Sequence, residues 1–322
     1  MKIAIRLMVL LGACAVAASA QASFPDRAIT FIVPFPPGGS TDTPARIVAE
    51  KMATALGQSV IVMNRAGASG QIGVNAAARA HPDGYTMVLS ASATHTLPGV
   101  IGKKLPYDPI GDFRSVGTFV KFPLAVVGNI DLPPKSIKEL LPYVRDNANK
   151  ISIGVASTGS VSHFSAERFL SETQARPVLA HYQGDSAILS DLIGGVIQLG
   201  VFSASSSAPL IQAGKVRGYI VAGNKRYSLT PDVPTVEESG MPGALLEVWY
   251  GISVPAGTPD AAIQKLNQAL KVALDDPSVV KALNERGFEP NYSTPEKLDQ
   301  IIVEEPKEWQ ALMDANNIKI EQ

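Results

Sequence analysis

Cysteine is nearly absent from this chain of 322 residues. The one cysteine, Cys14, lies within an apolar segment at the N-terminus, and none follows it. Everything downstream therefore lacks disulfide bonds, a thiol nucleophile and thiolate metal ligands. Histidine is scarce as well, and the pair His163 and Glu167, four residues apart on an expected helix, has no further ligand cluster beside it. We therefore expect neither a metal site nor a cofactor.

Basic tracts and long apolar runs are also missing. The chain has 28 Lys and Arg against 29 Asp and Glu. Without Lys2 and Arg6 of the N-terminal segment, 26 basic residues stand against 29 acidic ones, a net charge of −3. This balance argues against nucleic acid and anionic membrane surfaces as partners. Beyond the N-terminal segment, no stretch reaches the roughly 18 uninterrupted apolar residues of a membrane-spanning helix.

The first 22 residues match a secretory signal peptide. Lys2 and Arg6 form a short basic start, Leu7–Ala18 is apolar, and Ala18-Ser19-Ala20 and Ala20-Gln21-Ala22 both fit a cleavage site. The apolar stretch is too short to span a bilayer stably. We expect cleavage after Ala22 and export to the periplasm.

A lipoprotein is the alternative for this segment. Leu11-Gly12-Ala13-Cys14 has the residue types of a lipobox. The chain stays apolar after Cys14, however, and the apolar core before it is very short. These features favour a plain cleavable signal.

Short apolar runs alternate with amphipathic helical patterns along the rest of the chain. Strands are predicted at Ile29–Val33, Val60–Met63, Thr86–Ser90, Val116–Val120, Leu124–Val127, Ile151–Val155, Leu199–Val201, Gly218–Ala222 and Val248–Val254. A capping box of Ser136 and Glu139 introduces the helix Ile137–Arg145, and Thr235 with Glu238 repeats the device. This alternation implies an α/β protein with mostly parallel sheets.

Two strand-rich segments, Phe119–Asn129 and Glu247–Pro255, have the pattern of crossings between domains. In the first, two strand-like runs meet at Pro123. If both segments are hinges, residues 23–122 and 247–322 form a discontinuous first lobe and residues 123–246 form a second. Two α/β lobes joined by two strands enclose a cleft, where ligands bind.

One junction between strand and helix stands out, in the segment Ile29–Arg46. An apolar run ends at Val33, a loop rich in Pro and Gly follows, and Ser40 and Thr41 are good helix starters. Free backbone N–H groups and the positive end of the helix dipole meet at such a corner, which binds phosphate or carboxylate. An ordinary capped turn is the alternative, although capping does not exclude contact with a ligand. We expect Asp42 to stabilise the helix start, because a carboxylate in the site would repel an anion.

A second junction of the same kind follows Ile151–Val155. There a Ser/Thr/Gly loop, Ser157–Ser162, runs into a helix start at His163. Two such loops facing each other across a cleft would grip an anion without a buried Lys or Arg. Hydroxyls and backbone amides suit a carboxylate, because each bond to it is charge-assisted.

Seven motifs, in order along the chain, connect it to a known family. They are PFPPGG-STD-AR (34–46), NRAGASGQIG (64–73), PDGYT (82–86), LPYDPIGDF (105–113), STGSVSHF (157–164), LTPDVPTVEESGMPG (229–243) and VPAGTP (254–259). Together they resemble the tripartite tricarboxylate transporter substrate-binding receptors, the Bug family. The resemblance covers essentially the whole mature chain.

The resemblance implies a type II periplasmic binding protein whose two α/β lobes close on a small carboxylate. It implies a monomeric receptor that works with membrane transporter subunits and not an enzyme. The ligand residues that it assigns are Pro36, Gly38, Gly39, Ser40 and Thr41 in the first loop, Ser157, Thr158, Gly159 and His163 in the second, and Tyr182, Gly184 and Asp185 in an aromatic-x-Gly segment. The sequence departs from the family pattern at Pro37, His181 and Gln183. These departures leave the implied carboxylate site intact, and they bear on the identity of the part of the ligand farther from that carboxylate.

Two other functions remain open at this point. A sensor subunit would have the same fold but would signal to the ectodomain of a membrane kinase, and both roles use the closed form as their signal. An exported hydrolase could use Ser157, His163 and Asp185, which are the residue types of a triad. No G-x-S-x-G elbow is present, however, and Ser157 and His163 are only six residues apart across a helix start.

Overall fold

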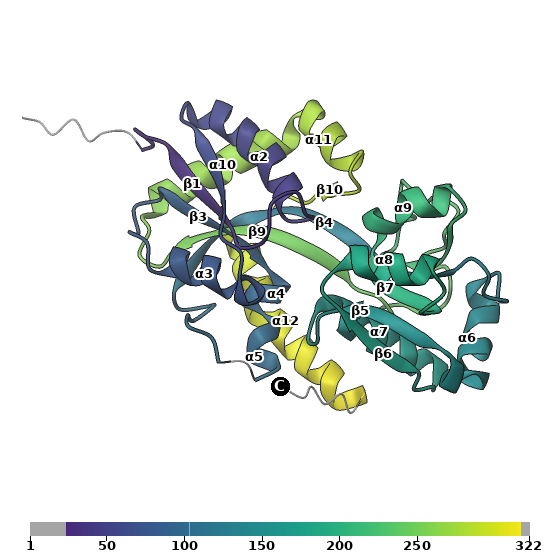
Figure 1. The fold of residues 1–322 in the computed structure, drawn as a ribbon. Coiled ribbons are helices and arrows are strands. Elements are labelled where there is room, and N and C mark those ends of the chain that lie inside the picture. Colours follow the sequence, from purple (N-terminus) through teal and green to yellow (C-terminus); the bar gives the residue numbers. More distant parts are fainter. Residues whose placement is uncertain (1–23, 103, 317–322) are drawn as a thin grey trace, which may run out of the picture.

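The structure, a computed structural model, describes residues 24–102 and 104–316. The expected signal peptide of residues 1–22, with the alternative lipid anchor at Cys14, lies outside the described residues. Two α/β lobes lie side by side, and two long strands run between them (Figure 1). The predicted α/β class and the two crossover strands are therefore confirmed.

The first lobe is built on three parallel strands in the order β2-β1-β3. They are β1 (Ile29–Val33), β2 (Val60–Asn64) and β3 (Thr86–Ala91). The lobe's helices are α2 (Asp42–Leu56), α3 (Gln71–Ala78), α4 (Ser92–His95), α5 (Leu97–Val100), α10 (Asp260–Asp275) and α11 (Pro277–Asn284). Val48 and Met52 lie one helical turn apart on α2 and pack with Phe31 of β1 in the buried core. Gly57, with φ of +67°, ends α2 in the left-handed conformation.

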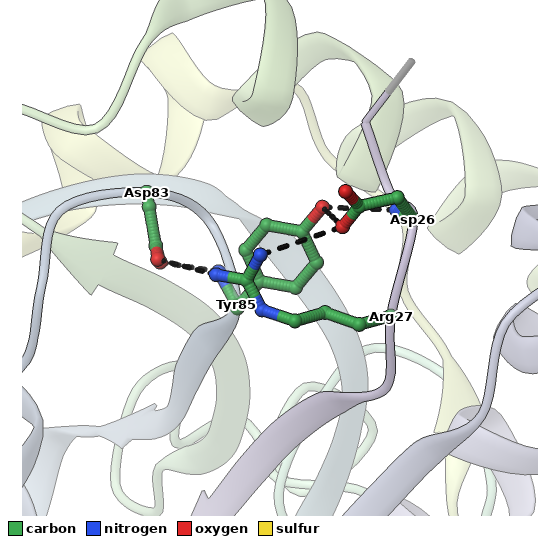
Figure 2. A network of polar contacts seen from close by, with 4 residues as sticks. All are labelled: Asp26, Arg27, Asp83 and Tyr85. Atoms are coloured by element: carbon green, nitrogen blue, oxygen red, sulfur yellow. Dashed lines mark hydrogen bonds and ion pairs between the residues drawn. The ribbon is translucent and has the colours of Figure 1, made fainter. Parts of the chain in front are cut away.

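The chain enters β1 through the network of polar contacts in Figure 2. The Tyr85 hydroxyl donates to Asp26 Oδ1 over 2.6 Å, and Arg27 donates to Asp83 Oδ2 over 2.9 Å. The Arg27 guanidinium also lies 3.6 Å from the centre of the Tyr85 ring, a cation–π contact. Asp83 and Tyr85 precede β3, so the network fixes the N-terminal ends of β1 and β3. The opposite ends of these strands lead into the candidate site.

The second lobe repeats this architecture. Its strands are β5 (Ser152–Ala156), β6 (Val178–Tyr182), β7 (Leu199–Ser203) and β8 (Val216–Val221), of which β7, β5 and β6 run parallel. Its helices are α6 (Ile137–Asp146), α7 (Val161–Thr173), α8 (Asp185–Ile193) and α9 (Ala204–Gln212). The predicted capping box of α6 forms, with the Ser136 hydroxyl accepting from the Glu139 N–H. The Glu238 N–H donates to the Thr235 hydroxyl and the Thr235 N–H donates to the Glu238 carboxylate, but this pair closes a turn and not a helix.

The crossover strands are β4 (Phe113–Asn129) and β9 (Glu247–Pro255), which pair antiparallel. Two separate runs were expected in this part of β4, but the structure has one strand that passes straight through Pro123. At that residue β4 changes partner: Pro123 is opposite Glu247 of β9, while Leu124 is opposite Ser203 of β7. A proline without an N–H is tolerated at such a break in the ladder.

The last helix, α12 (Pro295–Asn316), extends along both lobes (Figure 1, yellow). Trp309 of α12 packs with Leu97 and Ile101 of the first lobe and with Val161 and Phe164 of the second. The two-residue strand β10 (Glu289–Pro290) precedes α12 and pairs with β4. The expected lobe boundaries at 122/123 and 246/247 stay a prediction about which residues move together. Among the described helices, none combines the length and the apolar character needed to cross a membrane.

Candidate functional site

A cavity of about 720 Å³ lies between the lobes, at the carboxyl ends of the parallel strands β1, β3 and β5. Ligands of open α/β sheets bind at this end of the strands. The lining residues are Phe35, Pro36, Pro37, Gly38, Gly39, Ser40, Thr41, Ala91, Ala93, Ala156, Val161, Gln183, Gly184, Asp185, Ser186, Ser206, Val248 and Tyr250. All five predicted residues of the first loop and two of the third segment, Gly184 and Asp185, are among them.

The first loop connects β1 to α2, and hydrogen bonds to the Asp42 side chain fix its conformation. The buried Asp42 carboxylate accepts the Gly38 N–H over 2.9 Å, the Arg46 guanidinium over 2.9 Å and the Asn64 amide over 2.8 Å. Burial alone would raise the pKa of Asp42, but these hydrogen bonds lower it below its ordinary value. Asp42 is therefore an ionised structural group whose charge is compensated within the protein.

Free hydrogen-bond donors remain on this loop. The backbone N–H groups of Gly39, Ser40 and Thr41 have no hydrogen-bond partner among the residues that the structure describes. They directly precede α2, whose dipole places partial positive charge at the same point. The Ser40 hydroxyl lies 3.4 Å from the Tyr250 hydroxyl of β9. This corner can accept a carboxylate or another small anion without a cationic side chain.

The second predicted loop uses several of its donors internally. The Gly159 N–H donates to His163 Nδ1 over 3.0 Å, and the Ser160 hydroxyl accepts the His163 N–H over 3.1 Å. Ser157, Thr158, Gly159 and His163 are not among the residues that line the cavity, whereas their neighbours Ala156 and Val161 are. A Cβ on Gly159 would lie 2.5 Å from Ile101 at the end of α5, so the loop packs closely against the first lobe.

His163 is buried and accepts a hydrogen bond at Nδ1. Burial, together with His181 whose ring centre lies 4.9 Å away, lowers the pKa of His163 to about 4. The ring is therefore neutral near pH 7 and supports the Gly159 turn. His163 Nε2 is 3.9 Å from Glu167 Oε1, and no group of three metal-ligating side chains occurs within residues 24–102 and 104–316.

In the third predicted segment, Tyr182 has a structural role, whereas Gly184 and Asp185 line the cavity. The Tyr182 hydroxyl donates to Asp191 Oδ2 over 2.7 Å, which ties β6 to α8, and Tyr182 does not line the cavity. Asp185 begins α8 and lines the cavity, and Ser206 of α9 donates to its Oδ2 over 2.7 Å. Burial raises the pKa of Asp185, while the bonds from Ser206 and from the Ser203 backbone oppose this shift.

Sequence reasoning missed the part of the wall that β9 contributes. Val248 and Tyr250 both line the cavity. They are two residues apart on a strand and therefore point to the same side. The sequence indicates only a crossing strand here, because a continuous apolar run does not show which side of the strand faces a ligand. Ser206 was missed as well, because nothing in the sequence connects α9 with the start of α8.

Comparisons with known proteins place the chain among bacterial receptors. A family model described as Tripartite tricarboxylate transporter family receptor matches residues 44–318. Protein BugT of Bordetella pertussis is 32% identical over 299 residues, which cover 92% of this chain and 92% of BugT.

Solved structures agree with this match. A structure of a periplasmic transporter is 40% identical with a TM-score of 0.83 and covers 93% of this chain and 100% of its own. MatC from Rhodopseudomonas palustris with bound malate is 32% identical with a TM-score of 0.78, covering 90% and 99%. The R. palustris protein Rpa4515 with adipate is 30% identical with a TM-score of 0.83, covering 92% and 99%.

Proposed function

Because the chain belongs to the tripartite tricarboxylate transporter receptor family, we propose that it captures a small carboxylate between its lobes and delivers it to the membrane subunits of a transporter of that type. The expected Bug-family membership is confirmed, as is the type II periplasmic binding fold. The chain is a solute-binding receptor and not an enzyme, so the hydrolase alternative is set aside.

The unpaired N–H groups of Gly39, Ser40 and Thr41 carry the proposal for the ligand. They converge at the start of α2 on one wall of the cavity, where an anion gains both hydrogen bonds and the helix dipole. The bound malate and adipate of two related structures support a carboxylate as that anion.

The remaining ligand contacts are proposals of the same kind. Pro36 and Gly38 shape the first loop, Gly184 and Asp185 line the cavity from the start of α8 in the second lobe, and Tyr250 adds a hydroxyl from β9. For Ser157, Thr158, Gly159, His163 and Tyr182, a ligand contact stays a prediction, because these residues flank the cavity without lining it.

The family consists of periplasmic binding proteins, and we place this chain in the same compartment. Its export by a signal peptide cleaved after Ala22 is part of the proposal, supported by the basic, apolar and small-residue parts of residues 1–22. N-terminal sequencing of the exported protein should find Ser23 or Gln21 as its first residue; an acylated Cys14 would instead indicate a lipid anchor.

A thermal-shift screen over small carboxylates tests the function. A ligand that binds only the folded state adds RT ln(1 + [L]/Kd), about 2.7 kcal/mol at a hundredfold excess over Kd. The location is tested by Ala93→Phe, which places a large side chain at an exposed position of the cavity wall. We expect this variant to lose the ligand-induced shift.

Ala55→Phe is the matched control. Ala55 is exposed on α2 and does not line the cavity, so the same added volume should leave binding unchanged. Wild-type affinity in Ala93→Phe would move the site elsewhere, first to the second cavity of about 490 Å³ beside Lys121 and Tyr227.

A further inference from the structure

The wall of the proposed anion site carries an acidic side chain and no cationic one. Among the described residues that line it, none is Lys, Arg or His, and Asp185 is the one carboxylate. A ligand with negative charge at both ends would therefore meet an acid and no compensating cation. Like charges held close together in a partly buried site repel each other.

Asp185 is held in place by neutral donors. Ser206 donates to its Oδ2, and the carboxylate lies in the first turn of α8, where the helix dipole favours negative charge. No cationic side chain of the described residues forms an ion pair with it. Burial still raises the pKa of Asp185 against these donors, so a cationic group brought by the ligand would stabilise its ionised form.

The two polar ends of the cavity come from different lobes. The free N–H groups of residues 39–41 belong to the loop before α2, and Asp185 belongs to the start of α8. Phe35, Val161 and Val248 add apolar surface to the same cavity. A ligand that reaches both ends needs an anionic group, a short apolar body and a group that donates to a carboxylate.

We infer that the ligand is an amino-carboxylate, with its carboxylate at the N–H groups of residues 39–41 and its ammonium group at Asp185. This inference rests on the proposed function and narrows its ligand class. Gln183 and Ser186 flank Asp185 on the same wall, and their side-chain oxygens can accept the other two ammonium protons. Each lobe then satisfies one end of the zwitterion, so the ligand favours the closed arrangement.

The competing explanation is a protonated Asp185 that donates to the second carboxylate of a diacid. The substitution Asp185→Asn separates the two, because an asparagine amide can still donate to a carboxylate but carries no charge to hold an ammonium group. Asp260→Asn is the matched control, since Asp260 lies in the first turn of α10 and away from the cavity. It reports what the loss of a helix-start acid does away from the cavity, together with the loss of the exposed ion pair between Asp260 and Arg114.

The test is calorimetric titration with three ligand series of matched length. Each series has one to four methylene groups: the amino acids from glycine to 5-aminopentanoate, the diacids from malonate to adipate, and the corresponding monocarboxylates. We expect at least one amino acid to bind wild type about tenfold or more tightly than the diacid of equal length, a difference of about 1.4 kcal/mol. Asp185→Asn should remove this preference, while Asp260→Asn should keep it.

Each other outcome has a defined meaning. A wild type that prefers diacids, or an Asp185→Asn variant that still prefers amino acids, overturns the ammonium site and leaves the carboxylate receptor intact. If no member of any series binds wild type while a broader carboxylate screen succeeds, the ammonium inference also fails. Failure of that broader screen, in contrast, counts against the proposed function itself.

Discussion

A buried histidine in each lobe, His95 and His163, leads us to predict that acid destabilises the protein. Burial lowers the pKa of His95 to about 3, and burial with His181 nearby lowers that of His163 to about 4. In the unfolded chain both groups return to an ordinary pKa of about 6.5. Below that pH the unfolded chain binds protons that the folded protein does not, so stability is complete above pH ~6.5 and falls toward pH ~4.

We predict that His163→Gln flattens this dependence. The glutamine oxygen can still accept the Gly159 N–H, but the side chain no longer titrates. Because one pKa unit corresponds to about 1.4 kcal/mol, His163 accounts for about 3 kcal/mol of the stability lost between pH 6.5 and 4. Urea denaturation at a series of pH values measures it, with the exposed His81→Gln as control. An unchanged slope in His163→Gln would show that His163 does not remain neutral in the folded state.

Single residues also show where sequence reasoning stops. The run of Ser, Thr and Gly at 157–160 correctly indicated a loop before a helix, yet the same composition describes donors for a ligand and donors for the protein itself. Gly159 gives its N–H to His163, while Gly39 keeps its own free. Only the positions of neighbouring side chains distinguish the two cases.

At the scale of elements, one half-buried acid, Glu305, ties α12 to the rest of the protein. Glu305 accepts from Ser92 and Thr96 of the α4 region and from Trp249 Nε1 of β9, over 3.0, 2.5 and 3.0 Å. Burial raises the pKa of Glu305, and these hydrogen bonds oppose the shift. The helix is thus tied to a crossover strand and to the segment after β3.

We predict that Glu305→Ala destabilises the protein by about 2–4 kcal/mol, because its buried donors lose their acceptor. Thermal unfolding measures the loss. Glu304→Ala, at the exposed neighbouring position of the same helix, should change the midpoint little. Equal effects of the two substitutions would mean that helix propensity, and not the buried network, sets the stability of α12.

Elements with strong local patterns were predicted well. The strands β1, β3 and β9 carry continuous apolar runs, and the helix α10 has its apolar face at regular spacing. The edge strand β6 was not predicted, because Val178 and His181 are exposed and leave no strong apolar run. Thr235 and Glu238 formed a capping box without a helix, since the chain turns back at Gly240, where φ is +71°.

For the whole molecule, ligand binding should close the lobes about β4 and β9. Each lobe supplies part of the cavity wall, so the ligand is completely satisfied only when both approach it, and this difference in affinity shifts the population. Closure must accommodate the apolar contacts of Trp309 with both lobes and the hydrogen bond from the Tyr227 hydroxyl to the Gly287 carbonyl.

We predict a smaller radius of gyration in small-angle scattering at saturating ligand than without ligand. In a double-mutant cycle, Ser40→Ala and Thr158→Val should each weaken binding by about ten- to a hundredfold, with non-additive losses if both residues contact the same bound carboxylate after closure. An identical scattering profile with and without ligand would indicate a preformed site. Wild-type affinity in Thr158→Val would place Thr158 outside the ligand contacts, and strictly additive losses would mean that the two residues act independently.

The sequence by itself determined the α/β class, the two crossover strands, the first loop and the family, because these depend on local periodicity, turn residues and motifs in order. The tertiary structure alone decided which loops reach the cavity. Tyr250, Ser206 and Asp185 come from β9, α9 and α8, and no local pattern predicts their meeting. The protonation state of Asp185 depends on burial and on hydrogen bonds from residues that are distant along the chain, such as Ser206, so only the tertiary structure determines it.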